Sequence, residues 1–171
     1  TPLGQPIDRH YVEAFLDKNR EDVQGRILEI AGNEYTRRFG GQRVRQSDVL
    51  HAVPGNEEAT VIGDLAGGRG ISENTYDCMI ITQTFHVIYD VQSAIRNCHA
   101  ALKEGGVLLA TLPCISQISR YDMDRWGDYW RFTDASAMRI FGDVFGRKNI
   151  TLETYGNVLT AVGFLHGVAA G

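Results

Sequence analysis

Four polar side chains that could bind a ligand stand at or next to the ends of apolar runs in the chain. They are Glu29, Asp48, Asp64 and Gln83. Carboxylates and amides accept hydrogen bonds from hydroxyl and amine groups, which is the chemistry that holds a nucleotide-like cofactor. If the apolar runs are strands of a parallel sheet, these side chains lie at the carboxyl ends of strands, where open α/β sheets bind their ligands. We therefore expect them to converge on one rim.

The first apolar run, residues 26–32, has the sequence Arg-Ile-Leu-Glu-Ile-Ala-Gly. Its aliphatic residues are typical of a strand that is covered on both faces, and Gly32 allows the backbone to turn sharply where a ligand approaches. Glu29 is the exception in this run. Two interpretations are equally supported by these residues alone: Glu29 contributes to a ligand site, or it is the one acid of a core strand and reaches solvent.

His86 is the first candidate for a catalytic group. It follows the apolar run at residues 76–82 closely enough to point toward the same rim. A neutral imidazole within hydrogen-bond reach of a hydroxyl group acts as a general base. Lone histidines are more often structural, and that alternative stays open here.

Residues 114–132 break the apolar pattern, being polar and aromatic and containing both tryptophans. We interpret them as a lid or substrate-binding segment. Its acids Asp122 and Asp124 are suited to orient the hydroxyl groups of an acceptor. Together with His86 they complete the set of predicted catalytic residues.

A structural alternative applies to the end of this segment, and we favour it there. Trp130 and Phe132 then pin the loop to the core, and Arg131 pairs with Asp128. Cys114, with no paired histidine implied, is expected to be a small buried residue.

The composition argues against several classes of protein. A net charge of −4 does not suit binding to duplex nucleic acid, which requires a clustered excess of Lys and Arg. The three cysteines lie far apart and form no C-x-x-C pair, so neither a disulfide framework nor a metal site is predicted. The longest weakly polar run, residues 158–170, is too short to cross a bilayer, and the amino terminus has no signal-like segment. We expect one cytoplasmic domain over residues 1–171 with a small-molecule partner; the sequence does not specify an oligomeric state.

Helical and strand patterns alternate along the chain. An amphipathic helix is expected to begin at Pro6, a second to be capped by Asp90, and a third by Thr133 or Asp134. The connection between the first two strands is short for a parallel pair. Residues 158–170 fit neither a strand nor a helix well, so both stay open. Strands are predicted at residues 26–32, 43–49, 60–64, 76–82, 107–112 and 150–155. This order predicts an α/β fold with a mostly parallel sheet and flanking helices.

Two stretches carry a family resemblance. Residues 76–113 contain Tyr-Asp-Cys-Met-Ile-Ile-Thr-Gln-Thr-Phe-His, then Asp90 and its helix, and then Lys-Glu-Gly-Gly-Val-Leu-Leu-Ala-Thr-Leu-Pro. This stretch resembles the fourth strand, helix and fifth strand of class I S-adenosylmethionine-dependent methyltransferases, of the type 11 kind. Residues 127–133, Gly-Asp-Tyr-Trp-Arg-Phe-Thr, are similar to a segment of bacterial members, some of them associated with glycan assembly. The resemblance implies a Rossmann-like fold and S-adenosylmethionine as the cofactor.

The resemblance also implies roles for the residues of the rim. The residues implied near the amino acid portion of the cofactor are Glu29, Gly32 and Asn33. Asp48 takes the position that binds the ribose, and Asp64 and Leu65 take the positions that meet adenine. Gln83 takes the position beside the methionine and sulfonium end. A vicinal diol suits a carboxylate acceptor, and so does an exocyclic amine.

The chain departs from the family pattern in two places. The loop after the first strand carries Asn33-Glu34-Tyr35 in place of further glycines, and the antiparallel strand that usually completes the sheet is expected to be missing or truncated. The absence of G-x-G-x-x-G argues against a nicotinamide-dependent oxidoreductase. The expected function is methyl transfer to a small acceptor, with a hydroxyl of a sugar or glycan precursor as the suggested target. The alternative is a degenerate methyltransferase fold that serves as a binding or scaffold module without catalysis.

Overall fold

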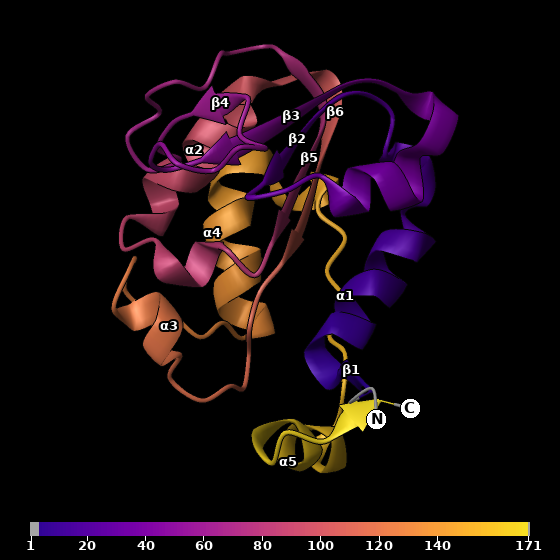
Figure 1. Cartoon of the computed structure of the whole chain (residues 1–171), viewed down its shortest axis with the longest axis vertical. Helices are drawn as coiled ribbons and strands as arrows, with labels where there is room; N and C mark the ends of the chain where they lie inside the picture. The colour runs from indigo at the N-terminus through magenta and orange to yellow at the C-terminus, as the bar shows by residue number, and fades with distance from the viewer. Residues whose placement is uncertain (1–3, 171) are drawn as a thin grey trace.

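The computed structural model describes residues 4–170, which are organised around a five-stranded sheet of order β4-β3-β2-β5-β6 (Figure 1). Every neighbouring pair in this sheet is parallel, which confirms the predicted mostly parallel sheet. Its strands are β2 (Gly25–Ile30), β3 (Val44–His51), β4 (Val61–Ile62), β5 (Tyr76–Thr82) and β6 (Leu102–Thr111).

Helices cover both faces of the sheet. Helix α1 packs on one face, and α2 and α4 pack on the other (Figure 1). The Asp90 side chain accepts a hydrogen bond from Ser93 N at 3.0 Å and caps α2, and Thr133 caps α4, as predicted. The helices are α1 (Ile7–Lys18), α2 (Val91–Ala101), α3 (Arg120–Met123), α4 (Asp134–Phe145) and α5 (Val158–Leu165).

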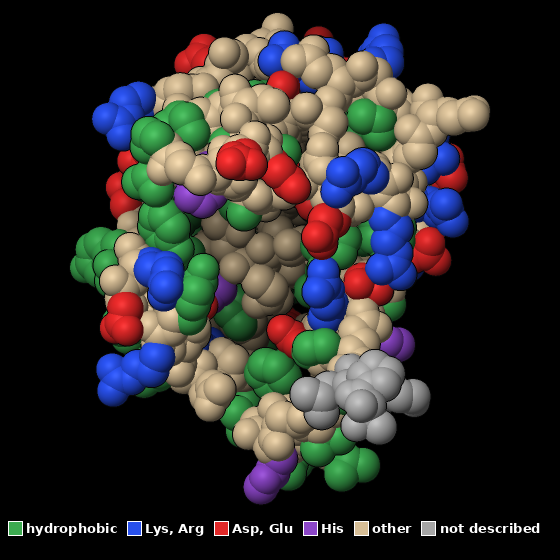
Figure 2. Space-filling view, in the orientation of Figure 1, with side chains coloured by type: hydrophobic (Ala, Val, Ile, Leu, Met, Phe, Trp, Pro, Cys, Tyr) green, Lys and Arg blue, Asp and Glu red, His purple; other side chains and the backbone are tan. Residues whose placement is uncertain are grey.

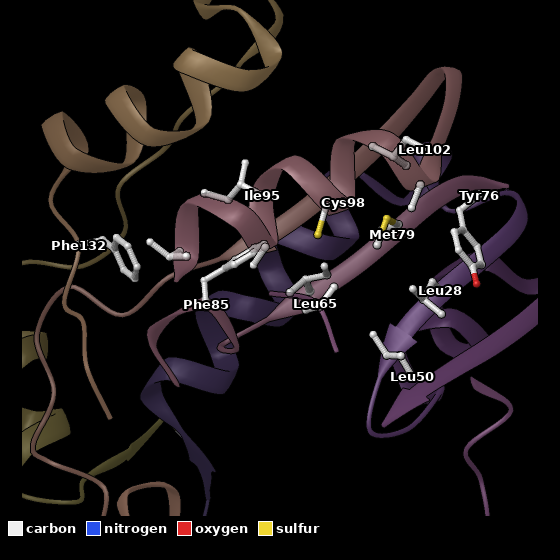
Figure 3. Packing of buried hydrophobic residues seen from close by; sticks show 14 residues of the cluster. Leu28, Leu50, Leu65, Tyr76, Met79, Phe85, Ile95, Cys98, Leu102 and Phe132 are labelled. Carbon is white, nitrogen blue, oxygen red and sulfur yellow. The ribbon is translucent and has the colours of Figure 1, made fainter. Parts of the chain in front are cut away.

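The core is centred on β5. Its side chains from Cys78 to Ile81 are fully buried and alternate between the two faces, so each face of the sheet has its own apolar cluster. Figure 3 shows the cluster between the sheet and α2, where Met79, Ile95 and Cys98 pack together. Burying a side chain of this size contributes roughly 1.5–3 kcal/mol, which explains why the continuous apolar run forms the central strand.

The predicted sixth strand, residues 150–155, is wrong. This stretch is extended and largely exposed, but no described strand pairs with it because the sheet ends at β6. A strand needs a neighbour to satisfy its backbone groups, and an apolar alternation alone does not supply one. The expected absence of the last antiparallel strand from this sheet is confirmed for residues 4–170.

The stretch that the sequence left open, residues 158–170, begins with a helix. Asn157 caps α5 with a hydrogen bond from Thr160 N at 3.0 Å. The chain then forms β7 (Ala169–Ala170), which pairs antiparallel with β1 (Gln5–Pro6) in a separate two-stranded sheet.

Candidate functional site

The chain reverses its direction across the sheet between β2 and β5. From β2 it proceeds outward through β3 and β4, and after β5 it proceeds to β6 on the other side, so β2 and β5 flank a topological switch point. Open α/β sheets bind their ligands in the crevice beyond the carboxyl ends of such strands. Ala31 and Gln83 follow these two ends with positive φ angles of 66° and 45°. Such a conformation costs a non-glycine residue about 1–3 kcal/mol and is typical of functional sites.

Glu29 supports the loop that lines this crevice. Its side chain is 5% exposed, and its two carboxylate oxygens accept hydrogen bonds from Tyr35 N at 3.1 Å and Thr36 N at 2.7 Å. Burial raises the pKa of Glu29, while these hydrogen bonds oppose the rise. The interpretation in which Glu29 reaches solvent is wrong, because its carboxylate is buried and bound by backbone amides. A contribution of Glu29 to a ligand site stays a prediction.

Gly32 and Asn33 form the near wall of the crevice. A Cβ added at Gly32 would meet only Glu58 Oε2 within 4 Å, at 3.5 Å, so the backbone is open to approach. Asn33 Oδ1 is buried and accepts no hydrogen bond from any described residue. An orphaned buried acceptor beside an open glycine suits a ligand that carries an N–H donor, such as the amino group of S-adenosylmethionine. The neighbouring loops, residues 52–64, carry Glu57, Glu58 and Asp64 but no basic residue.

Asp48 is not brought to the rim. Strand β3 continues to His51, two residues past its predicted end, so Asp48 lies inside the strand opposite Leu28. Its side chain is 7% exposed and accepts a hydrogen bond from Arg26 Nε at 2.7 Å. The residue at the carboxyl end of β3 is His51, whose Nδ1 lies 2.7 Å from Val53 O. The signal for the longer strand was the apolar pair Val49-Leu50, which continues the run past Asp48.

Asp64 and Leu65 follow β4 but face different ways. Asp64 is exposed and one of its oxygens accepts Ala66 N at 2.9 Å, which leaves the other available. Leu65 is 5% exposed and its side chain belongs to the apolar core. Only the backbone of Leu65 is therefore suited to contact a ligand.

His86 lies beside Gln83 in a short helical turn, Phe85–Val87. It is 9% exposed, and its Nδ1 is buried without a hydrogen-bond partner among the described residues. Burial lowers the pKa of His86, while the carboxylates of Asp128 and Asp122 oppose the shift. The lowered pKa favours the neutral imidazole, which is the form able to accept a proton. His86, Gln83 and Asp122 line the same groove, whereas Asp124 is exposed and outside its lining.

The end of the lid is fixed to the core through its backbone and Phe132, as the structural alternative predicted, whereas the Trp130 side chain is exposed. Tyr129 N and Trp130 N donate to His86 O at 2.9 and 3.2 Å, and Phe132 is 6% exposed. Arg131 makes two hydrogen bonds to Asp128, one of them at 2.9 Å. These contacts place the lid directly over the turn that carries His86.

The middle of the lid contacts the end of β3. Trp126, just after α3, makes an edge-to-face contact with His51, with ring centroids 5.9 Å apart. Cys114, expected to be buried, is exposed, because it lies past the end of β6 where the chain leaves the sheet.

Within residues 4–170, no helix combines the length and apolar character that spanning a membrane requires, and no three His, Cys, Asp or Glu side chains are grouped as a metal site would need.

Comparisons with known proteins agree with this geometry. A methyltransferase-domain model matches residues 22–110. The polyketide synthase ThaQ of Burkholderia thailandensis is 29% identical over 101 residues, which cover 56% of this chain and 4% of that protein. The chain thus spans only a small fraction of the length of this relative.

Solved structures share the fold. The N-methyltransferase NodS from Bradyrhizobium japonicum, solved with S-adenosyl-L-homocysteine, aligns with a TM-score of 0.57 and 15% identity over 81% of this chain and 75% of that chain. An S-adenosylmethionine-dependent methyltransferase from Mesorhizobium loti aligns with a TM-score of 0.56 and 17% identity over 81% and 80%. Because the family model covers more than half of the sequence, the chain belongs to the methyltransferase-domain family of class I S-adenosylmethionine-dependent methyltransferases.

Proposed function

We propose that this chain binds S-adenosylmethionine in the crevice between β2 and β5 and directs its methyl group to a small acceptor held beside His86. The proposal is supported by an open glycine loop after β2, and by Gln83 and a buried, unpartnered imidazole after the neighbouring strand β5. Such a switch point is where open α/β sheets bind their ligands.

Residues of the crevice suit different parts of the cofactor. The Asn33 oxygen and the open backbone at Gly32 suit its amino acid portion, and the free oxygen of Asp64 suits its exocyclic amine. At the ribose position the geometry favours His51 over Asp48, because Asp48 already binds Arg26. When bound, the cofactor supplies an electrophilic methyl group on a sulfonium sulfur.

The chain itself contributes positioning and a base. His86 Nδ1 accepts the proton of an acceptor hydroxyl as the oxygen gains the methyl group, and the Asp122 carboxylate stabilises the resulting imidazolium. Because the lid is tied to His86 O, it keeps the imidazole in place and restricts water.

For the acceptor we propose a hydroxyl of a sugar or glycan precursor. Support comes from the exposed aromatic rings and acids of the lid, since aromatic faces stack on sugars and carboxylates accept their hydroxyl hydrogens. Release of the demethylated product should be followed with nucleotide sugars, phenols, carboxylic acids and, given the polyketide synthase relative, β-ketothioesters. Turnover of sugars alone would support the assignment, and turnover of any other class without sugars would refute it.

Titration calorimetry tests cofactor binding with S-adenosylmethionine and S-adenosylhomocysteine. We expect both to bind, and Asp64→Asn to weaken binding about tenfold or more because a charged hydrogen-bond acceptor contributes about 1.5–3 kcal/mol. Asp48→Asn serves as the contrast: it should lower thermal stability, since Arg26 loses its buried partner, with little change in affinity.

Two outcomes would contradict this assignment. Loss of cofactor binding in a folded Asp48→Asn protein would restore the ribose role of Asp48. Failure of either compound to bind the unaltered chain at millimolar concentration would favour a non-catalytic binding module.

A further inference from the structure

The groove that contains Gln83, His86 and Asp122 continues beyond these residues along the free side of β6. It has a volume of about 1480 Å³ and runs from the lid past β6 toward α1 and residues 149–157. In Figure 2 this face is visibly hollowed near its centre. Because β6 is the last strand of its sheet, one wall of the groove is an open sheet edge.

The backbone of β6 offers hydrogen bonds to this groove. Thr111 O accepts Gln83 N at 3.0 Å and therefore points toward the β5 side. Within a parallel strand the N–H and C=O groups of one residue point the same way and those of its neighbours point the opposite way. Leu108 and Ala110 consequently direct their N–H and C=O groups outward, where no strand among residues 4–170 pairs with them.

The apolar layers on both faces of the sheet continue past β6. On one side, Tyr11 and Phe15 of α1 line the groove, and on the other side Phe141 and Phe145 of α4 do so. All four rings are only partly buried. The space between them lies in the plane of the sheet, with a backbone edge behind it and apolar side chains on either face. That shape suits an extended strand with aliphatic residues on both faces.

The stretch that failed to form a strand lines the far wall. Residues 150–155 form neither helix nor strand in the described chain and contribute Ile150 and Leu152 to the groove. Ile150 N donates to Arg147 O at 3.3 Å, whereas the backbone groups of residues 151–155 make no backbone hydrogen bond with described residues and are available to a strand placed in the groove.

The charges of the lining are unbalanced. Of the basic side chains that line it, Lys103 and Arg131 are engaged by Asp77 and Asp128, which leaves only Arg120 without an ion pair in the described chain. The lining acids that form no ion pair with a described residue are Asp8, Glu104, Asp122 and Asp134. An occupant with Lys or Arg side chains complements this excess of negative charge.

We propose that the groove beside β6 is a docking site for a β-strand of another polypeptide, in which aliphatic residues alternate with Lys or Arg. The strand pairs with the outward groups of Leu108 and Ala110 and buries its aliphatic side chains against α1 and α4. Main-chain hydrogen bonds supply affinity in this mode of recognition, and side-chain pockets supply selectivity.

A labelled synthetic strand tests the proposal by fluorescence anisotropy. The probe is acetyl-Lys-Val-Thr-Val-Arg-Val-Thr-Val-Lys-amide, and its matched control carries Glu at the three basic positions. We expect saturable binding of the basic strand and at least about tenfold weaker binding of the acidic one. Equal affinities, or no binding of the basic strand at millimolar concentration, would overturn the proposal.

A pair of proline variants identifies the surface. Ala110→Pro removes one outward N–H and places the ring on the open edge, where proline is tolerated by edge strands. Ala135→Pro, in the exposed first turn of α4 and outside the groove, is the control. The first variant should lose strand binding and the second should keep it, with circular dichroism confirming the fold. Unchanged binding by folded Ala110→Pro would contradict docking at β6.

Cys114 gives a second measurement that needs no variant. It lines the groove and is exposed, while Cys78 and Cys98 are buried and burial raises the pKa of both thiols to about 12. A thiol reagent should therefore react first at Cys114, and bound strand should slow this reaction. Binding of the strand without protection of Cys114 would place it elsewhere and overturn the assignment.

Discussion

His86→Gln should lower kcat by about 10² to 10⁴ while leaving the affinity for S-adenosylmethionine almost unchanged. The expected loss is that of a general base, and glutamine keeps a polar side chain of similar size without a titratable nitrogen. His86 lines the groove and is 9% exposed, and its buried Nδ1 has no hydrogen-bond partner, so no described protein group competes for this atom. Steady-state kinetics with a turned-over acceptor measures the effect, and calorimetry measures cofactor binding.

His99→Gln is the matched control, because His99 is exposed on α2 and its ring packs edge-to-face against Phe145, with ring centroids 4.9 Å apart. It should retain the kcat of the unaltered protein. The pH profile gives a further check: a base must be neutral to act, and burial lowers the pKa of His86, so the acid limb of kcat/KM should lie at lower pH than the titration of an ordinary histidine. A His86→Gln enzyme with unaltered kcat and the same acid limb would remove His86 from the mechanism.

Arg131→Met should lower the free energy of unfolding by about 3 kcal/mol. This value is near the low end of the destabilisation expected when one member of a buried ion pair is removed. The Asp128 side chain is only 1% exposed, so without Arg131 it becomes a buried charge supported by Ser119 N alone. For a chain of this size the change corresponds to a fall in Tm of about 6–12 °C. Because the same pair fixes the lid over His86, kcat should fall as well.

Arg139→Met is the control for removal of an arginine from an ion pair. Its pair with Asp143 on α4 is exposed and should contribute only about 0.3–0.5 kcal/mol.

The dependence of stability on pH gives a second test of the Arg131–Asp128 pair. Arg131 lowers the pKa of Asp128 to about 2, so the pair contributes stability above pH 3.8 and loses it as the pH falls toward 2. The difference between the unaltered protein and Arg131→Met should shrink over that range, and a constant difference would show that the ion pair is not its cause.

The parts of the fold that depend on local signals were predictable from the sequence. The continuous apolar run of β5 is stable only when it is buried, which predicts a central strand. The caps at Asp90 and Thr133 determine where α2 and α4 begin. The pairing of Arg131 with Asp128 followed from their spacing of three residues and opposite charge.

The errors concern features that depend on distant parts of the chain. Residues 150–155 have a strand-like sequence, but whether they form a strand depends on a neighbour, which β6 does not provide. Asp48 was assigned to the rim because the predicted strand ended at residue 49. Strand β3 extends two residues further, so His51 is the residue at its carboxyl end. Strand ends are set by pairing with β2 and β4, so a motif placed by strand boundaries shifts with them.

The acidic loops at residues 52–64 have a kinetic consequence. Glu57, Glu58 and Asp64 make no ion pair with a described basic residue, so this end of the sheet carries uncompensated negative charge next to the crevice. S-adenosylmethionine has a net positive charge, and such a field accelerates the encounter of oppositely charged partners by about 10- to 10³-fold at low ionic strength. We therefore expect the association rate of the cofactor in stopped-flow measurements to fall steeply with added salt, and that of an uncharged adenosine analogue to stay nearly constant.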